Sequence, residues 1–147
     1  GAPGLGGPHP LVFLTLILLA TSLAQVTPGA RYRQFLTRHV DFPKTSTTND
    51  RIYCNLLMQR RGMTRPICKP TNTFIHTPAD QVQAICRHAG RCHRQNLCDS
   101  NAAFRLTTCR VAPGSHPGRC FYRGRVQTRQ IRVACNRLLP IHFDRVL

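Results

Sequence analysis

Eight cysteines limit what this chain can fold into more than any other feature of its sequence. Their spacings are long and irregular, without the CxxC pairs that are typical of structural zinc sites. In an exported chain, an even number of such cysteines predicts four disulfides. The spacing leaves the pairing open, because eight cysteines can combine in many ways. They occupy positions 54, 68, 86, 92, 98, 109, 120 and 135.

The N-terminal segment provides the argument for export. Residues 11–20 read LVFLTLILLA, an apolar run that is shorter than the ~20 residues of a membrane-spanning helix. Small residues follow this run, and a cut after Ala24 fits a signal peptidase. We therefore expect residues 1–24 to be a signal peptide and residues 25–147 to form one secreted domain. The segment before the run lacks Lys, Arg and an initiator Met, so we expect this signal peptide to be incomplete at its N-terminus.

The rest of the chain is strongly basic. The sequence holds 21 Lys and Arg against 5 Asp and Glu, which gives a net charge of +16 at pH 7 with histidine neutral. The only lysines are Lys44 and Lys69, so arginine supplies most of the charge, and a guanidinium can bind phosphate through two parallel hydrogen bonds. This charge predicts an acidic partner: a nucleic acid, an anionic membrane or a sulfated glycan.

Periodicity predicts three helices in the first half of the chain. The inward face of the first helix carries Tyr32, Phe35, Leu36, His39 and Val40. Pro43 is expected to end this helix. A second helix is expected at about 49–61, with Gly62 as its stop. A third is expected to begin with Thr77 as its N-cap and a proline in the first helical position.

The second half changes to the pattern of strands. Segments near 104–111, 119–126, 129–135 and 139–146 are rich in Val, Ile, Phe, Tyr and Thr, and they are separated by Gly, Pro and Asn. Helices followed by antiparallel strands are typical of an α+β fold, which is the fold class that we predict.

Two short segments carry residues that are suited to acid–base chemistry. In LPIHFD, residues 139–144, strand alternation places His142 and Asp144 on one face and turns Phe143 to the core. A carboxylate beside an imidazole fixes its tautomer and favours its protonated form, as a general acid requires. In CKPTNTF, Lys69 directly follows a cysteine, so a disulfide would anchor its backbone. Either segment alone is more often structural than catalytic.

Taken together, three motifs resemble the pancreatic-type ribonuclease superfamily. CKPTNTF at 68–74 is similar to that family's signature around a catalytic lysine, and PIHFD at 140–144 is similar to its C-terminal histidine motif. FLTRHVDFP at 35–43 resembles its first helix, which carries the other histidine. The order and approximate spacing of the cysteines agree as well. The resemblance implies three helices and a curved antiparallel sheet that form a V-shaped cleft, and an enzyme that needs no metal and no cofactor.

The resemblance also implies how the cysteines pair. The expected disulfides are Cys54–Cys109, Cys68–Cys120, Cys86–Cys135 and Cys92–Cys98. The short loop closed by the last pair is absent from the angiogenin branch of the family, so its presence favours the ribonucleolytic branches. The segments HVDFPKT and MQRRGM, in contrast, are angiogenin-like.

The same motifs imply an active site for RNA cleavage on the 3′ side of pyrimidines. A neutral His39 would take the proton of the ribose 2′-OH, and a protonated His142 would donate to the departing 5′-oxygen. Lys69 would stabilise the charge of the transition state, and the product would be a 2′,3′-cyclic phosphate. Thr73 would read the pyrimidine, and Asp144 would orient His142. The residues implied in substrate binding are Arg38, Asn72, Thr73, Phe143 and Asp144.

Three positions depart from the family pattern. Arg38 stands where Gln usually precedes the first histidine, and it would contact the phosphate with a charged group. Thr108 replaces a frequent Asp and leaves the choice between uridine and cytidine open. Asn136 stands where a Glu is often involved with the second base.

Three functions are compatible with these features. The first is a secreted, monomeric endoribonuclease that acts on RNA, with antibacterial host defence as a further role and ribonuclease inhibitor as a partner that the resemblance implies. The second is a cationic protein that disrupts anionic membranes, and the third is an angiogenin-like signalling factor with weak catalysis. The catalytic residues favour the first function. The histidines expected to be structural or on the surface are His76, His88, His93 and His116.

Overall fold

The computed structural model describes residues 27–147 and has the predicted α+β fold. The expected signal peptide, residues 1–24, lies outside the described residues. The helices are α2 (Pro28–His39), α3 (Asp50–Arg60) and α4 (Ala79–Gln83). The strands are β1 (Thr71–Ile75), β2 (Gly90–Cys92), β3 (Leu97–Ser100), β4 (Phe104–Val111), β5 (Tyr122–Arg129), β6 (Ile131–Asn136) and β7 (Leu139–Val146).

Helix α2 forms as its sequence pattern predicts. The Thr27 side chain caps its first turn by accepting a hydrogen bond from the Ala30 N–H at 3.1 Å. Phe35 and His39 are buried on the inward face. The helix ends at His39, because the backbone of Val40 is already extended, so the prediction that Pro43 ends it is wrong. The catalytic candidate on this helix therefore sits at its last turn, next to the sheets.

The other two helices agree only partly with prediction. Helix α3 is capped by Asn49, whose side chain accepts from the Ile52 N–H at 2.9 Å. Helix α4 begins at Ala79, one residue later than expected, and the prediction that Thr77 caps it is wrong. Pro78 holds the N-cap position with an extended ψ of 144° and provides no side-chain cap. A residue before proline is also disfavoured in helical conformation, which keeps Thr77 outside the helix.

The strands form two antiparallel sheets, with strand orders β1-β4-β5 and β2-β3-β6-β7. The predicted strands at 104–111 and 139–146 are confirmed as β4 and β7. Strand β5 starts three residues later than expected, because the chain before it turns through a small loop closed by the His116–Arg119 bridge. Strands β1, β2 and β3 were not predicted, because they are short and lie among turn-forming residues.

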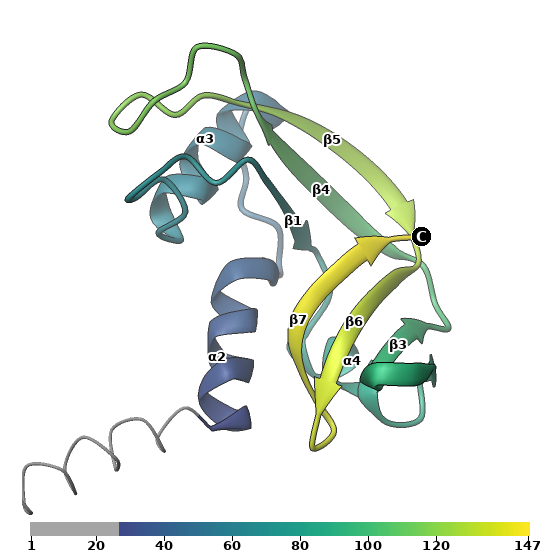
Figure 1. The fold of residues 1–147 in the computed structure, drawn as a ribbon. Helices are drawn as coiled ribbons and strands as arrows, with labels where there is room; N and C mark the ends of the chain where they lie inside the picture. The colour runs from purple at the N-terminus through teal and green to yellow at the C-terminus, as the bar shows by residue number, and fades with distance from the viewer. Residues whose placement is uncertain (1–26) are drawn as a thin grey trace, which may run out of the picture.

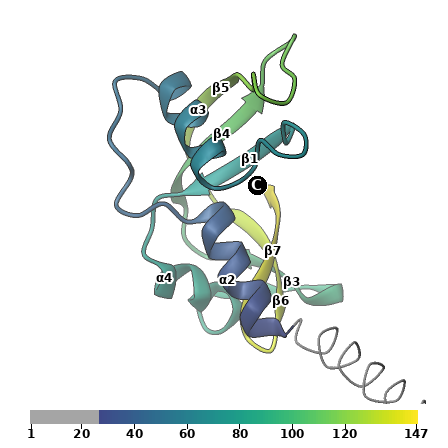
Figure 2. The same cartoon turned by 90° about the vertical axis from the view of Figure 1, so that its left-hand side faces the viewer.

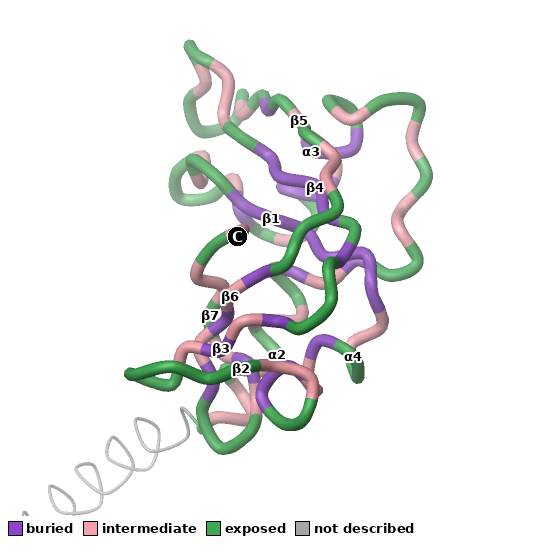
Figure 3. Tube along the Cα trace, turned by 90° about the vertical axis from the view of Figure 1, so that its right-hand side faces the viewer, coloured by how far each residue is buried: buried purple, intermediate pink, exposed green. Residues whose placement is uncertain are grey.

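The buried apolar side chains form two clusters. Helix α3 packs on the β1-β4-β5 sheet through Tyr53 and Leu57, which are fully buried near Phe74 and Tyr122. Gly124 allows the close approach, because a Cβ there would lie 2.7 Å from the Asp50 carbonyl oxygen. The second cluster joins α2 and α4 to the β2-β3-β6-β7 sheet and to the ends of β1 and β4. Figure 3 shows buried residues along β1 and β4, in the middle of the molecule. Residues of the second cluster include Phe35, Val82, Ile85, Leu106, Ile131 and Val133.

The four disulfides join the pairs that the family resemblance implied: Cys54–Cys109, Cys68–Cys120, Cys86–Cys135 and Cys92–Cys98. The first three connect residues that are 55, 52 and 49 positions apart. Closing loops of this length stabilises the fold by roughly 4 kcal/mol each in a chain-entropy treatment. Two of these bridges belong to the core around α3, so covalent links compensate for its small size.

The two sheets diverge from a common region, and α2 lies along β7 on one side of the opening (Figures 1 and 2). The carbonyl of Ile75, at the end of β1, accepts a hydrogen bond from the Asp41 N–H and so ties the end of α2 to the first sheet. Among residues 27–147, no helix is both long and apolar enough to cross a membrane.

Candidate active site

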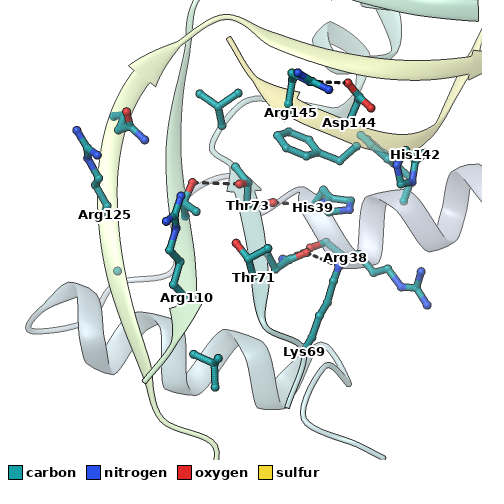
Figure 4. A pocket seen from close by; sticks show the side chains of 18 of the residues that line it. Arg38, His39, Lys69, Thr71, Thr73, Arg110, Arg125, His142, Asp144 and Arg145 are labelled. Atoms are coloured by element: carbon teal, nitrogen blue, oxygen red, sulfur yellow. Dashed lines mark hydrogen bonds and ion pairs between the residues drawn. The ribbon is translucent and has the colours of Figure 1, made fainter. Parts of the chain in front are cut away.

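A cleft of about 1030 Å³ lies between the two sheets and α2. Side chains from α2, β1, β4, β5 and β7 line it (Figure 4). The structure brings His39, Lys69 and His142 to this cleft from three distant parts of the sequence. The residues implied in substrate binding also line it, namely Arg38, Asn72, Thr73, Phe143 and Asp144.

His39 is buried and has a defined tautomer. Its Nδ1 lies 2.9 Å from the carbonyl oxygen of Thr73. A carbonyl oxygen can only accept, so Nδ1 carries the proton and donates this bond. In the neutral ring, Nε2 then keeps its lone pair. Phe35 at 5.1 Å and Phe143 at 5.2 Å between ring centroids hold the imidazole in place.

The surroundings of His39 keep the imidazole neutral. Burial, with only 7% of the residue exposed, is the largest cause of a pKa lowered from 6.5 to about 3. The hydrogen bond to Thr73 acts in the other direction. The nearby positive charges of Lys69, His142 and Arg38 lower the pKa further. A neutral imidazole with a lone pair on Nε2 can accept a proton in the cleft.

The backbone and the side chain of Lys69 are both held by hydrogen bonds. Its N–H donates to the Met63 carbonyl oxygen and its own carbonyl oxygen accepts from the Tyr122 hydroxyl, each at 2.9 Å. The ammonium donates to Asn72 Oδ1 at 3.0 Å. Burial, and then the charge of Arg38, lower the pKa of Lys69 from its ordinary 10.5. A fixed cation therefore lies within the cleft, and Asn72 orients it.

Asn72 also connects the lysine to α2. Its Nδ2 donates to the carbonyl oxygen of Arg38 at 2.9 Å, so one buried amide binds Lys69 and the last turn of the helix at once. Arg38 itself projects an exposed guanidinium at the cleft wall. Asn72 thus sets the position of Lys69 relative to His39, which follows Arg38 on α2.

His142 lies on β7 in an irregular stretch of strand. The register between β6 and β7 skips Ile141 and Asp144, so both are bulged residues. The bulge breaks the alternation that placed Asp144 on the same face as His142. The carboxylate of Asp144 accepts a hydrogen bond from Arg145 Nε at 3.0 Å, rather than one from His142. Bulges cannot be read from a hydrophobic pattern, which explains the difference from the sequence analysis.

Two threonines, on β1 and β4, form part of the cleft wall. Thr73 Oγ1 and Thr108 Oγ1 lie 3.0 Å apart, and either hydroxyl can donate. The carbonyl of Thr73 points away from β4, toward His39, and its N–H points the same way, because both groups of one residue face the same side of an antiparallel strand. A flat ring placed beside Thr73 would meet a backbone donor and a hydroxyl that can donate or accept.

Sequence reasoning missed several arginines of the cleft. Arg110 on β4 and Arg123 and Arg125 on β5 line it (Figure 4 labels two of them). Arg123 and Arg125 lie inside the strand predicted near 119–126, and alternation places them on one face, but only the pairing of β5 with β4 shows that this face lines the cleft. Among residues 27–147, no cluster of three or more His, Cys, Asp or Glu could hold a metal ion.

Known proteins provide an independent comparison. The family model for pancreatic ribonuclease matches residues 30–144. A ribonuclease of the turtle Chelonia mydas is 50% identical over 117 residues, which are 80% of this chain and 98% of the turtle protein. An angiogenin of the mouse is 42% identical over 139 residues, 94% of this chain and 92% of the angiogenin.

The fold agrees with the same comparison. The crystal structure of green turtle egg white ribonuclease superimposes with a TM-score of 0.77 at 50% identity, covering 80% of this chain and 98% of that one. The similarity therefore extends over nearly the whole part of the chain that the structure describes.

Proposed function

This chain belongs to the pancreatic ribonuclease family and is a metal-independent endoribonuclease, and we propose that it cleaves RNA on the 3′ side of pyrimidines with His39, Lys69 and His142. The observation that carries the proposal is the state of His39. Its Nδ1–H is engaged by the Thr73 carbonyl, and its imidazole is neutral, so Nε2 is available as a general base.

The mechanism uses a nucleophile that RNA supplies itself. Nε2 of His39 removes the proton of the ribose 2′-OH, and the oxygen attacks the adjacent phosphorus. The bond to the 5′-oxygen breaks as His142 donates a proton to that oxygen, which leaves a 2′,3′-cyclic phosphate. The ammonium of Lys69 stabilises the charge that develops on the phosphoryl oxygens. DNA has no 2′-OH and is not cleaved.

Recognition of the pyrimidine falls to Thr73. Its backbone N–H donates to O2 of the base, and its hydroxyl donates to N3 of cytosine or accepts from N3–H of uracil. Phe143 bounds the base site, and the exposed Arg38 contacts phosphate. The hydrogen bond between Thr73 and Thr108 supports this assignment, because either hydroxyl can be the donor.

We further propose that residues 1–24 direct export and that residues 25–147 act outside the cell as a monomer. Four disulfides and no free cysteine in residues 27–147 support an oxidising environment. Ribonuclease inhibitor is the expected protein partner, on the strength of family membership.

The test is turnover of pyrimidine–adenosine dinucleotides, with and without EDTA. The expected result is a 2′,3′-cyclic phosphate product, a rate that EDTA does not change, and no cleavage of the 2′-deoxy dinucleotide. The matched variant is His142→Ala, which keeps the disulfides and the fold but lacks the acid. Cleavage of the deoxy substrate, or an unchanged rate in His142→Ala, would reject the mechanism.

A second function is favoured by charge. A net charge of +16 binds anionic membranes whether or not the active site works, so we propose antibacterial activity. The test is killing and liposome leakage by the wild type and His142→Ala at equal concentration. Killing that survives the substitution and fades with salt supports membrane action. Killing that disappears with catalysis assigns the charge to RNA capture. Angiogenin-like signalling, which the similarity to mouse angiogenin suggests, predicts neither killing nor liposome leakage.

A further inference from the structure

One arginine stands in line with the threonines of the base site. Thr73 pairs with Thr108 across β1 and β4, and Thr108 pairs with Arg125 across β4 and β5. Residues that pair directly across antiparallel strands point to the same face. The three side chains therefore form one row across the sheet, and all three line the cleft.

The spacing of this row brings Arg125 within reach of a bound base. Arg125 lies one strand spacing, about 4.8 Å, from Thr108 and two from Thr73. An extended arginine side chain is longer than the first step, so the guanidinium can reach the edge of a base that lies against the threonine pair. Arg125 is exposed, and the salt bridges and side-chain hydrogen bonds of residues 27–147 do not engage its guanidinium. Figure 4 shows Arg125 on the strand beyond Thr73, on the side of the cleft away from His142.

The threonine pair cannot by itself distinguish uracil from cytosine. Each hydroxyl can donate or accept, so the pair reverses its direction to suit either N3. Gln127, in the next row, is equally indifferent because its amide has both a donor and an acceptor end. Only a group with a fixed hydrogen-bonding sense can therefore distinguish the two bases.

Arg125 has such a fixed sense. A guanidinium is a donor only and always charged. Position 4 of uracil is a carbonyl acceptor, whereas position 4 of cytosine is an amino donor. The one carboxylate among the described residues that line the cleft is Asp144, which lies on β7, outside the row of Thr73, Thr108 and Arg125, and whose Oδ2 accepts from Arg145.

We propose that Arg125 is a specificity-determining residue that makes this enzyme favour uridine over cytidine, by donating to the O4 atom of uracil. The proposal rests on the ribonuclease activity proposed above and names the substrate preference of that site. It also gives a physical reason for a threonine at position 108: a carboxylate there would pair with the guanidinium and withdraw it from the base.

The experiment compares kcat/KM for uridylyl-adenosine and cytidylyl-adenosine. The wild type is expected to cleave the uridine substrate faster, and Arg125→Gln is expected to lower the uridine/cytidine ratio by about three- to tenfold, the scale of one exposed charged hydrogen bond. Arg123→Gln is the matched control: the same strand and face, the same loss of charge, one row away. It should lower both rates alike and leave the ratio within about twofold, because loss of charge alone weakens both substrates equally.

Binding of uridine 3′-phosphate and cytidine 3′-phosphate, measured by calorimetry, separates this proposal from the one on which it rests. Loss of the uridine preference in Arg125→Gln supports the proposal even if turnover is absent, in which case only the proposed catalysis fails. An unchanged ratio in Arg125→Gln, a cytidine preference in the wild type, or an equal change of ratio in Arg123→Gln would overturn it.

Discussion

Two buried histidines lie beside β1, and of the two only His39 lines the cleft. His39 uses Nδ1–H to bind the Thr73 carbonyl and leaves Nε2 for chemistry. His76 uses both nitrogens: Nδ1–H donates to the Asp41 carbonyl at 2.9 Å, and Nε2 accepts from the Thr107 hydroxyl at 2.7 Å. They are similarly buried, at 7% and 8% exposure.

The comparison teaches that a lowered pKa does not identify a catalytic histidine. Burial is the largest cause of the lowered pKa in both. What differs is the partner of Nε2. Both nitrogens of His76 have hydrogen-bond partners within the protein. Its ring packs edge-on against Tyr53, whose hydroxyl donates to Asp41 at 2.6 Å. His76, directly after β1, therefore links the segment that follows α2 to β4, while His39 is available to react.

The largest difference between the two should appear in catalysis. His39→Ala and His142→Ala are each expected to lower kcat/KM by about 10²- to 10⁴-fold, the usual contribution of a positioned base or acid. His76→Gln should keep kcat/KM within a few-fold of wild type when only folded protein is counted. Steady-state cleavage of uridylyl-adenosine, with circular dichroism to count folded protein, measures all three. A His76 variant as inactive as the His39 variant would remove the distinction.

The acid dependence of stability should reveal that both imidazoles are neutral. The unfolded chain takes up protons near the ordinary pKa of about 6.5, whereas the folded state, with pKa values held lower, does not. The unfolded state thus binds more protons below this pH, and stability falls as pH falls. His39 alone should contribute about 2 kcal/mol of loss between pH 7 and pH 5.

Urea unfolding at several pH values checks this dependence. His39→Ala and His76→Gln should each show a shallower dependence than wild type, because each lacks one of the two imidazoles. In activity, the acidic limb of kcat/KM should lie below pH 6.5, since the base stays neutral there. Stability that does not change between pH 7 and pH 5 would mean that the two histidines are not held neutral.

How much of this could be predicted from sequence differs between the two histidines. His39 was predicted on the inward face of its helix, and the motif resemblance supplied its role. His76 was expected to be structural or on the surface, and it is buried, but its partners come from a strand pairing between β1 and β4 that periodicity did not predict. The directions of the Asp144 and Arg125 side chains could not be predicted either, because a bulge in β7 and the register of β5 decide them.

A moderate effect on stability is expected when the imidazole of His76, which is hydrogen-bonded at both nitrogens, is removed. His76→Gln leaves the Asp41 carbonyl and the Thr107 hydroxyl without their shared partner in a buried site. A loss of about 1–3 kcal/mol in unfolding free energy follows, the usual cost of an unsatisfied buried group. Urea unfolding at pH 7 measures it. A variant as stable as wild type would show that the two hydrogen bonds contribute little.

The smallest effect should come from freeing Nε2 of His76 instead of replacing its whole side chain. Thr107→Val takes away only the donor to Nε2 and keeps the shape of the side chain, so a loss of about 1 kcal/mol is expected. The substitution creates a second imidazole with a free Nε2, yet it should add no activity, because His76 does not line the cleft. New activity in Thr107→Val/His39→Ala would contradict the role assigned to position in the cleft.

The measurement that tests the central claim most directly is a titration of both histidines by NMR, with and without uridine 3′-phosphate. In the free protein, both imidazoles should titrate below pH 6.5. The bound phosphate dianion should raise the pKa of His39, since an adjacent negative charge favours the protonated ring, and should leave His76 unchanged. The account would be contradicted by a His39 that is already protonated at pH 7 or by a phosphate that moves both titrations equally.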